Sequence, residues 1–195
     1  MSFQSDNCAV IQGLVDLGFA HSYEVEFNPE FPPWGDWGCP SFAFGSRRED
    51  SLTIKVRPRQ GGQWVASFAL ETHGVLNGVY ACPNRGQLLV LTGSNAFLMP
   101  ASDPAKTQEL PIHPVRSLAE PPGTELLIVG SFTEAAALDA NGIRWVTEGA
   151  FVDDLEFIDG PAGVIYVQGR RRPETDDLVV LTLDPMSGRV IDENR

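Results

Sequence analysis

The chain has 195 residues, of which 43% are hydrophobic and 21% are charged, and its formal net charge is −12. This composition is typical of one folded domain over residues 1–195, and the excess of acids argues against nucleic-acid binding, which needs clustered Lys and Arg. With three widely spaced cysteines, no apolar run of the ~20 residues that cross a bilayer and no secretory signal, we expect a reduced cytoplasmic protein without membrane contact.

The first predicted element is a short helix within residues 1–22. Ser5, Asp6 or Asn7 is a suitable N-cap, apolar residues then recur at a helical period, and Gly18 is a natural stop. We expect this helix to pack against the domain, and docking to a partner is the alternative.

An aromatic loop follows the first predicted strand. Tyr23–Phe27 alternates between apolar and polar residues, as a half-buried strand does. Residues 28–40 contain four prolines and two glycines, which exclude a helix or an interior strand. Because this loop carries Phe31, Trp34 and Trp37, it is either a binding surface or a lid folded over one end of the core.

Residues 41–191 contain four repeated β units. Their first strands are predicted at residues 42–46, 88–94, 126–131 and 164–169. Glycines mark the repeat, with a period of roughly 40 residues, and the second strands run into turns rich in Pro, Asn and Gly. The marking glycines are Gly45, Gly93, Gly130 and Gly169.

A fourth strand is predicted in each of the first three units, at residues 75–81, 115–118 and 150–158. The last unit has no fourth strand before residue 195, and Tyr23–Phe27 is the expected substitute. Such a substitution would close the units into a ring without exposed sheet edges.

The first strands are apolar on both faces, which favours small sheets stacked face to face over a sandwich with wet outer faces. The last unit contains the sequence Leu-Asp-Pro-x-x-Gly-x-Val at residues 183–190. It resembles the blades of β-propeller repeat proteins of the quinoprotein or WD40-like kind, over about residues 41–191. The resemblance implies an all-β fold, a small propeller-like ring of about four antiparallel units with one short N-terminal helix, and it carries over no functional residue.

No catalytic or metal-binding constellation is visible. His21, His73 and His113 are isolated from one another and from nucleophile motifs, and the cysteines lack zinc-ligand spacing. We therefore expect no catalytic residue, no metal and no cofactor.

The densest acidic stretch is the second candidate for a binding surface. Glu148 precedes it, and Asp153, Asp154 and Glu156 follow within a predicted strand in which Asp154 and Glu156 share one face. This face is either simply solvated or turned toward a partner, and the carboxylates are too few for a calcium cage.

Charge is also distributed unevenly along the chain. Residues 120–159 contain nine acids and one base, whereas residues 47–59 contain five bases and two acids. We expect the two ends of the molecule to carry opposite electric fields.

These features predict a non-enzymatic protein-binding module. In the most concrete form, an immunity- or antitoxin-like protein neutralises a basic partner through residues 148–159 and the loop of Trp34 and Trp37. The alternative is a small-molecule-binding protein or hydrolase-type enzyme with its site at the axial mouth of the ring, and a third reading is a structural subunit.

Overall fold

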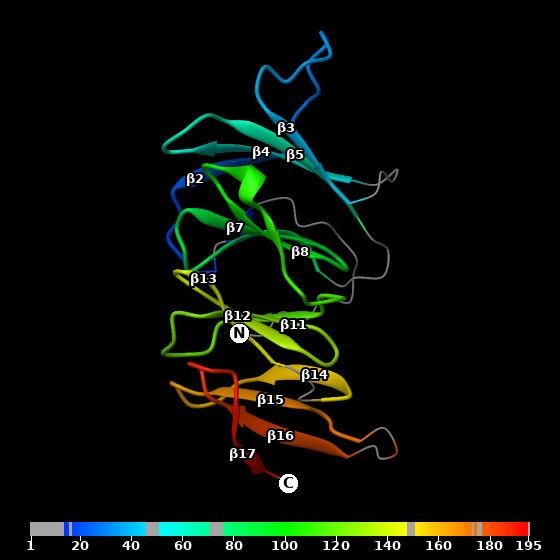
Figure 1. The fold of residues 1–195 in the computed structure, drawn as a ribbon, viewed down its shortest axis with the longest axis vertical. Coiled ribbons are helices and arrows are strands. Elements are labelled where there is room, and N and C mark those ends of the chain that lie inside the picture. Colours follow the sequence, from blue (N-terminus) through cyan, green and yellow to red (C-terminus); the bar gives the residue numbers. More distant parts are fainter. Residues whose placement is uncertain are drawn as a thin grey trace.

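The computed structural model describes residues 14–15, 17–45, 51–70, 76–147, 151–172, 174 and 177–194. These residues form four small sheets that stack face to face in a column (Figure 1). One 3-10 turn, η1 (Pro104–Lys106), is the only helical element among them. The all-β prediction is therefore confirmed.

Sheet 1 lies at one end of the column and carries the aromatic loop. Its strand order is β2-β4-β5-β3, and β3 pairs parallel with β5 whereas the other pairs are antiparallel. The strands are β2 (Tyr23–Phe27), β3 (Ser41–Phe44), β4 (Ser51–Pro58) and β5 (Trp64–Ala69).

Sheet 2 packs beneath sheet 1 and has the order β1-β6-β7-β8-β9. All five residues of β6 are buried, because this strand has a sheet on each side. The strands are β1 (Leu14–Val15), β6 (Asn77–Ala81), β7 (Gln87–Thr92), β8 (Ala96–Pro100) and β9 (Gln108–Glu109).

Sheets 3 and 4 complete the column, and in each of them the strands follow one another in chain order. Sheet 3 contains β10 (Ser117–Ala119), β11 (Leu127–Gly130), β12 (Ala135–Asp139) and β13 (Gly142–Val146). Sheet 4 contains β14 (Asp153–Ile158), β15 (Ile165–Arg170), β16 (Leu178–Leu183) and β17 (Val190–Asn194).

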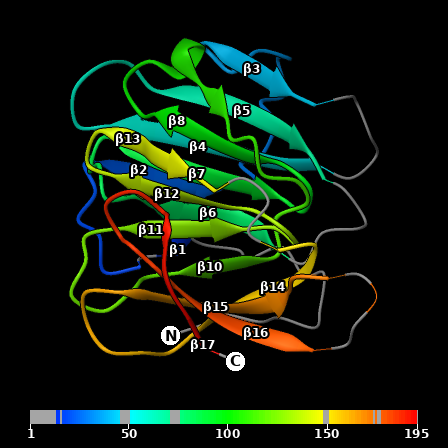
Figure 2. The same ribbon diagram turned by 60° about the horizontal axis from the view of Figure 1, so that its bottom comes forward.

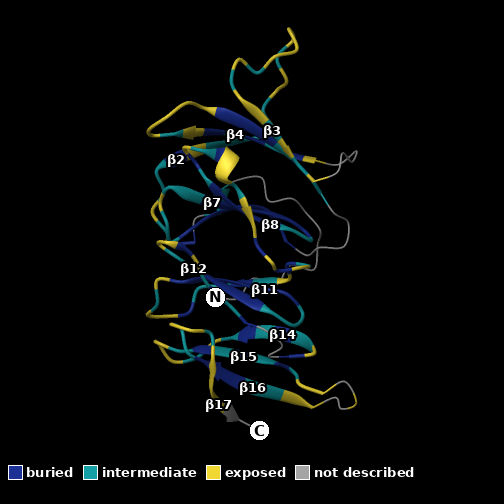
Figure 3. Cartoon of the chain, in the orientation of Figure 1, coloured by how far each residue is buried: buried dark blue, intermediate teal, exposed yellow. Residues whose placement is uncertain are grey.

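Three apolar clusters fill the three gaps between successive sheets. The cluster between sheets 1 and 2 contains Trp64 and Phe68. The cluster between sheets 2 and 3 contains Leu89 and Leu127, and the cluster between sheets 3 and 4 contains Trp145. Figure 3 shows that buried residues concentrate in the strands of the stack, whereas exposed residues lie mainly in the loops. The column is thus held together by face-to-face burial of apolar strands.

The two outermost faces of the column carry polar and charged side chains, and that of sheet 4 also carries Tyr166, Leu178 and Val180. On sheet 1, the outward residues of β4 include Thr53, Lys55 and Arg57, and on sheet 4 those of β15 include Gln168 and Arg170. Sheets 1 and 4 lie at opposite ends in both views (Figures 1 and 2). The described residues therefore form an open stack, and the predicted closed ring is wrong.

The grouping of strands into units is also corrected. Each predicted fourth strand belongs to the next sheet instead: the prediction at residues 75–81 falls on β6, beside β1 in sheet 2, and those at residues 115–118 and 150–158 fall on the edge strands β10 and β14. Tyr23–Phe27 pairs with β4, so it does not complete the last unit. Sheet 4 needs no substitute strand because β14 already supplies its fourth member.

The described part of the predicted N-terminal helix is not helical, and residues 1–13 lie outside the described residues. Leu14 and Val15 form β1, which pairs parallel with β6. Leu14 packs on the cluster between sheets 1 and 2, and Val15 packs on the cluster between sheets 2 and 3. Neighbouring apolar residues here face opposite sides of a strand, a pattern that a short run does not distinguish from a helix.

Candidate functional site

The aromatic loop of residues 28–40 connects β2 to β3 and projects beyond sheet 1 at the end of the column (Figure 1). The Trp34 side chain is 77% exposed and Phe31 is 57% exposed. No other large apolar residue in the described part of the chain is as exposed as Trp34. The alternative in which these side chains form a lid over the core is therefore wrong for Trp34 and Phe31.

Hydrogen bonds hold the loop in a defined shape. The Gly35 N–H donates to the Pro32 carbonyl at 2.9 Å, and the Gly38 N–H donates to Asp36 Oδ1 at 3.0 Å. At the base, the Val65 N–H of sheet 1 donates to the Pro40 carbonyl at 3.0 Å. Two turns within the loop and its base on sheet 1 are thus each defined by a hydrogen bond, and a loop shape set in advance reduces the entropy cost of binding.

The aromatic rings of the loop have different surroundings. Phe31 and Trp37 contact each other edge to face, with ring centroids 5.1 Å apart, and Trp37 is only half-buried. Trp34 sits between them in sequence and takes part in no ring pair among the described residues. The Phe31–Trp37 pair therefore supports the loop, and Trp34 is presented to solvent.

Acidic residues surround this loop. Residues 23–46 contain four acids and neither Lys nor Arg. Glu26 is paired with Arg57 of β4 at 2.6 Å on the outer face of sheet 1. Glu30 and Asp36 lie in the loop itself and are exposed. The loop that carries Trp34 therefore contains two exposed carboxylates and no base, whereas sheet 1 behind it also carries Lys55 and Arg57 on its outer face.

The acidic strand predicted as the second surface is β14, in sheet 4. Asp154 is paired with Arg170 of β15 at 2.8 Å, and Glu156 accepts a hydrogen bond from the Gln168 amide at 2.9 Å. Asp154 and Glu156 thus share one face, as the sequence predicts. Both carboxylates have partners on the adjacent strand, so this face has the character of a solvated sheet surface.

Asp153 accepts a hydrogen bond from the Asp154 N–H at 2.9 Å, and Asp154 adopts a positive φ of 58° at the irregular start of β14. Glu148 lies outside the described residues. Among the described residues, no group of three or more His, Cys, Asp or Glu is placed to hold a metal ion.

The structure does not bring the two predicted surfaces together. Trp34 and Trp37 lie at the sheet 1 end of the column, and Asp153, Asp154 and Glu156 lie in sheet 4 at the other end (Figure 1). A compact partner that covers one surface is therefore not expected to reach the other.

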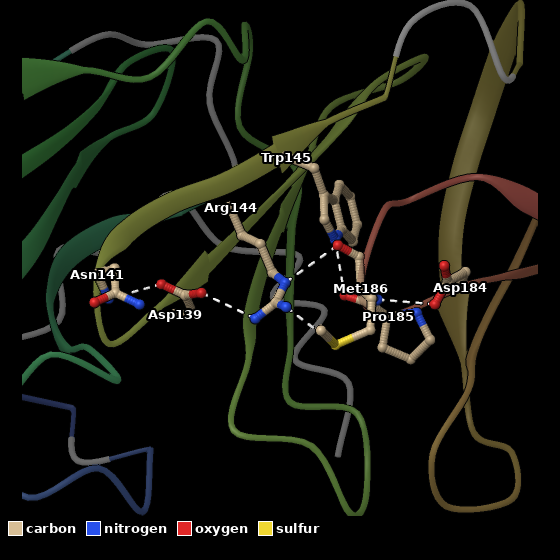
Figure 4. A network of polar contacts seen from close by, with 7 residues as sticks. All are labelled: Asp139, Asn141, Arg144, Trp145, Asp184, Pro185 and Met186. Carbon is tan, nitrogen blue, oxygen red and sulfur yellow. Dashed lines mark hydrogen bonds and ion pairs between the residues drawn. The ribbon is translucent and has the colours of Figure 1, made fainter.

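A cleft of about 530 Å³ opens between sheets 3 and 4, beside the β12–β13 and β16–β17 turns. Arg144 lies along it: its Nη1 donates to Asp139 Oδ2 at 3.0 Å and its Nε donates to the Met186 carbonyl at 3.2 Å (Figure 4). Its Nη2 contacts Met186 Sδ at 3.0 Å. Sequence reasoning did not single out Arg144, although it is the lone base within residues 120–159.

The neighbouring contacts indicate that this network joins two sheets. The Trp145 indole N–H donates to the Pro185 carbonyl at 2.9 Å, and the indole lies so close to Gly188 that an added Cβ would be 2.6 Å from a ring carbon. Gly188 also has a φ of +68°, which favours glycine. Asp139 and Asp184 each accept a hydrogen bond from a backbone N–H two residues ahead in their own turns. We call the group formed by Asp139, Arg144, Trp145, Asp184, Pro185, Met186 and Gly188 the sheet 3–4 clamp.

Contacts within its turn lower the pKa of the Asp184 carboxyl. Hydrogen bonds from the Ser187 hydroxyl and the Met186 N–H, with a smaller effect from nearby Arg144, hold the pKa of this carboxyl below its ordinary value. Asp139, Arg144 and Asp184 at the cleft are thus engaged in the turns and the contacts between sheets 3 and 4.

The buried Tyr80 hydroxyl and Cys82 thiol are both held in their protonated forms. Burial raises the pKa of Tyr80 to about 12 and the pKa of the Cys82 thiol far above its ordinary value. Both stay protonated at neutral pH, and a protonated thiol is a poor nucleophile. His113 is exposed, its Nδ1 lies 3.3 Å from the Ser94 carbonyl, and His73 lies outside the described residues.

Comparison with known proteins gives no family assignment. No protein-family model matches the chain, and no curated protein shows significant similarity to it. In the described part of the chain, no helix has the length and apolar character needed to cross a membrane.

Proposed function

We propose that this protein is a non-enzymatic protein-binding module whose partner-binding surface is the aromatic loop of residues 28–40. The observation that carries the proposal is the 77% exposure of Trp34 at the tip of a loop fixed by hydrogen bonds at both of its turns. Exposed tryptophan on an ordered loop matches the residue type and the rigidity of interface hot spots.

The rest of the column supplies a rigid base for this loop. Successive sheets bury continuous apolar faces, so the end of the stack is a stable platform from which a loop can be presented. We also propose that the stack is an open arc of propeller-like blades. Its face-to-face sheets, with strands in chain order in sheets 3 and 4, support this relationship.

An immunity- or antitoxin-like role in the cytoplasm is the concrete form of this proposal. A module of this kind would cover the working surface of its partner with the loop end of the column. The acidic strand β14 is not included in the surface, because its carboxylates have partners on β15 and it lies at the other end.

The test is capture of the partner from cells that express the tagged protein. We expect the double variant Phe31→Ala, Trp34→Ala to lose at least ~90% of the captured partner, since hot-spot truncation costs tenfold or more in affinity. Leu178→Ala is the matched control, because Leu178 is also an exposed apolar residue, 54% accessible, in sheet 4. Equal capture by the loop variant and the wild type would overturn the proposal.

A further inference from the structure

We infer that the loop recognises a cationic side chain, Lys or Arg, on an extended basic segment of its partner, with the Trp34 indole as the platform. This inference rests on the proposed function and names the chemistry that the same surface takes. An indole is the most favourable aromatic ring for a cation, and its face must be accessible for the contact. Trp34 meets this requirement with 77% exposure and no ring partner among the described residues.

The charges around Trp34 favour a cation over an apolar side chain. Glu30 and Asp36 flank it within the loop of residues 28–40, which itself contains no Lys or Arg. An apolar partner surface would cover these carboxylates without pairing them, which is unfavourable, whereas a basic segment pairs them. The net charge of −12 would also steer a basic partner toward the protein.

The same type of contact occurs within the molecule. The Arg116 guanidinium lies 4.2 Å from the centroid of the Phe132 ring, near the β11–β12 turn. Arg57, the arginine of sheet 1 on the outer face, is paired with Glu26 at 2.6 Å. Among the described residues no cation lies over the Trp34 ring, so a cation there is expected to come from the partner.

The experiment measures binding of a hexalysine peptide and of an uncharged hexaglutamine peptide by tryptophan fluorescence at 0.15 M salt. Trp64 and Trp145 are 2% and 8% exposed, so changes on peptide binding report mainly on the loop tryptophans. We expect hexalysine to bind, hexaglutamine not to bind, and Trp34→Ala to weaken hexalysine binding about tenfold when measured by calorimetry.

Two charge variants separate the loop from the overall charge of the protein. Glu30→Gln, Asp36→Asn is expected to weaken hexalysine binding at least ~fivefold, and Asp154→Asn, Glu156→Gln removes the same charge at the other end and is expected to change it less than ~twofold. Equal weakening by the two pairs, or no effect of Trp34→Ala, would overturn the inference.

Partner capture distinguishes this inference from the proposed function. If Trp34→Ala abolishes capture while Glu30→Gln, Asp36→Asn retains it at wild-type level, the loop is the binding surface but the cationic segment is wrong. If Trp34→Ala captures the partner normally, the proposed function itself is wrong.

Discussion

The two ends of the column meet solvent in different ways. At the sheet 1 end, Trp34 and Phe31 are exposed on an ordered loop, so large aromatic surface stays in water. At the sheet 4 end, Asp154 is paired with Arg170, and the exposed apolar residues Leu178 and Ile191, at 54% and 59%, lie within strands. Exposed apolar residues therefore occur at both ends, and the sheet 1 end differs because its exposed residues are aromatic and lie on a projecting loop.

The outer sheet faces at the two ends also resemble each other. In sheet 1 the first strand carries Glu24 and Glu26 beside Arg57, and in sheet 4 the first strand carries Asp154 beside Arg170. Charged side chains on an outer sheet face favour its solvation, as on the capping repeats of solenoid proteins.

The largest expected effect concerns the buried tryptophan of the sheet 3–4 clamp. Trp145→Ala removes the indole that packs on Gly188 and donates to the Pro185 carbonyl, and we expect the free energy of unfolding to fall by about 3–5 kcal/mol. Urea denaturation followed by circular dichroism measures this loss.

Trp34→Ala is the matched substitution at the other end, and we expect it to change the free energy of unfolding by less than about 0.5 kcal/mol. Similar losses for the two variants would show that Trp34 also supports the fold, and the contrast between the ends would then fail.

A smaller effect is expected for the charged pairs on the two end faces. Arg170→Ala and Arg57→Ala each remove one partner of an exposed pair, with side-chain exposures of 36% and 45%. Exposed pairs contribute less than about 1 kcal/mol, and high salt screens them, so both variants should approach wild-type stability in 0.5 M salt. A loss above about 2 kcal/mol at either end would contradict the description of these faces as solvated caps.

The smallest effect concerns acid stability at the β16–β17 turn. The folded-state pKa of Asp184 lies below its ordinary value of 3.8, so the unfolded state binds its proton first as pH falls. The stability from this carboxylate is present above about pH 4 and is lost as pH falls below 3.8 toward the folded-state value. Asp184→Asn should reduce the change of the free energy of unfolding with pH over this range. An unchanged pH dependence would contradict the lowered pKa of Asp184.

Much of the strand pattern could be predicted from the sequence. Tyr23–Phe27 is a strand with the predicted bounds, because strict alternation of apolar and polar residues is a strong local signal. The assignment of strands to sheets was wrong, because a strand such as Asn77–Ala81 pairs across a short turn with the strand that follows it, and alternation within one strand does not reveal its partner.

The candidate site was only partly predictable. Residue types in the loop indicated a binding surface, but exposure of Trp34 is a property of the folded loop. The pairing of Asp154 with Arg170 depends on register across the β14–β15 hairpin, which has an irregularity beside Asp153. Arg144 was missed because its partners Asp139 and Met186 come from two turns whose proximity follows from the stacking of sheets 3 and 4.

The most direct test of the central claim, that the loop is the binding surface, is site-specific photo-crosslinking. A photoreactive phenylalanine analogue replaces Trp34 in one variant and exposed Leu178 of sheet 4 in another. Irradiation in cells should give a crosslinked partner from position 34 and none from position 178. Crosslinks to the same protein from position 178, with none from position 34, would contradict the claim and place the binding surface at the other end of the column.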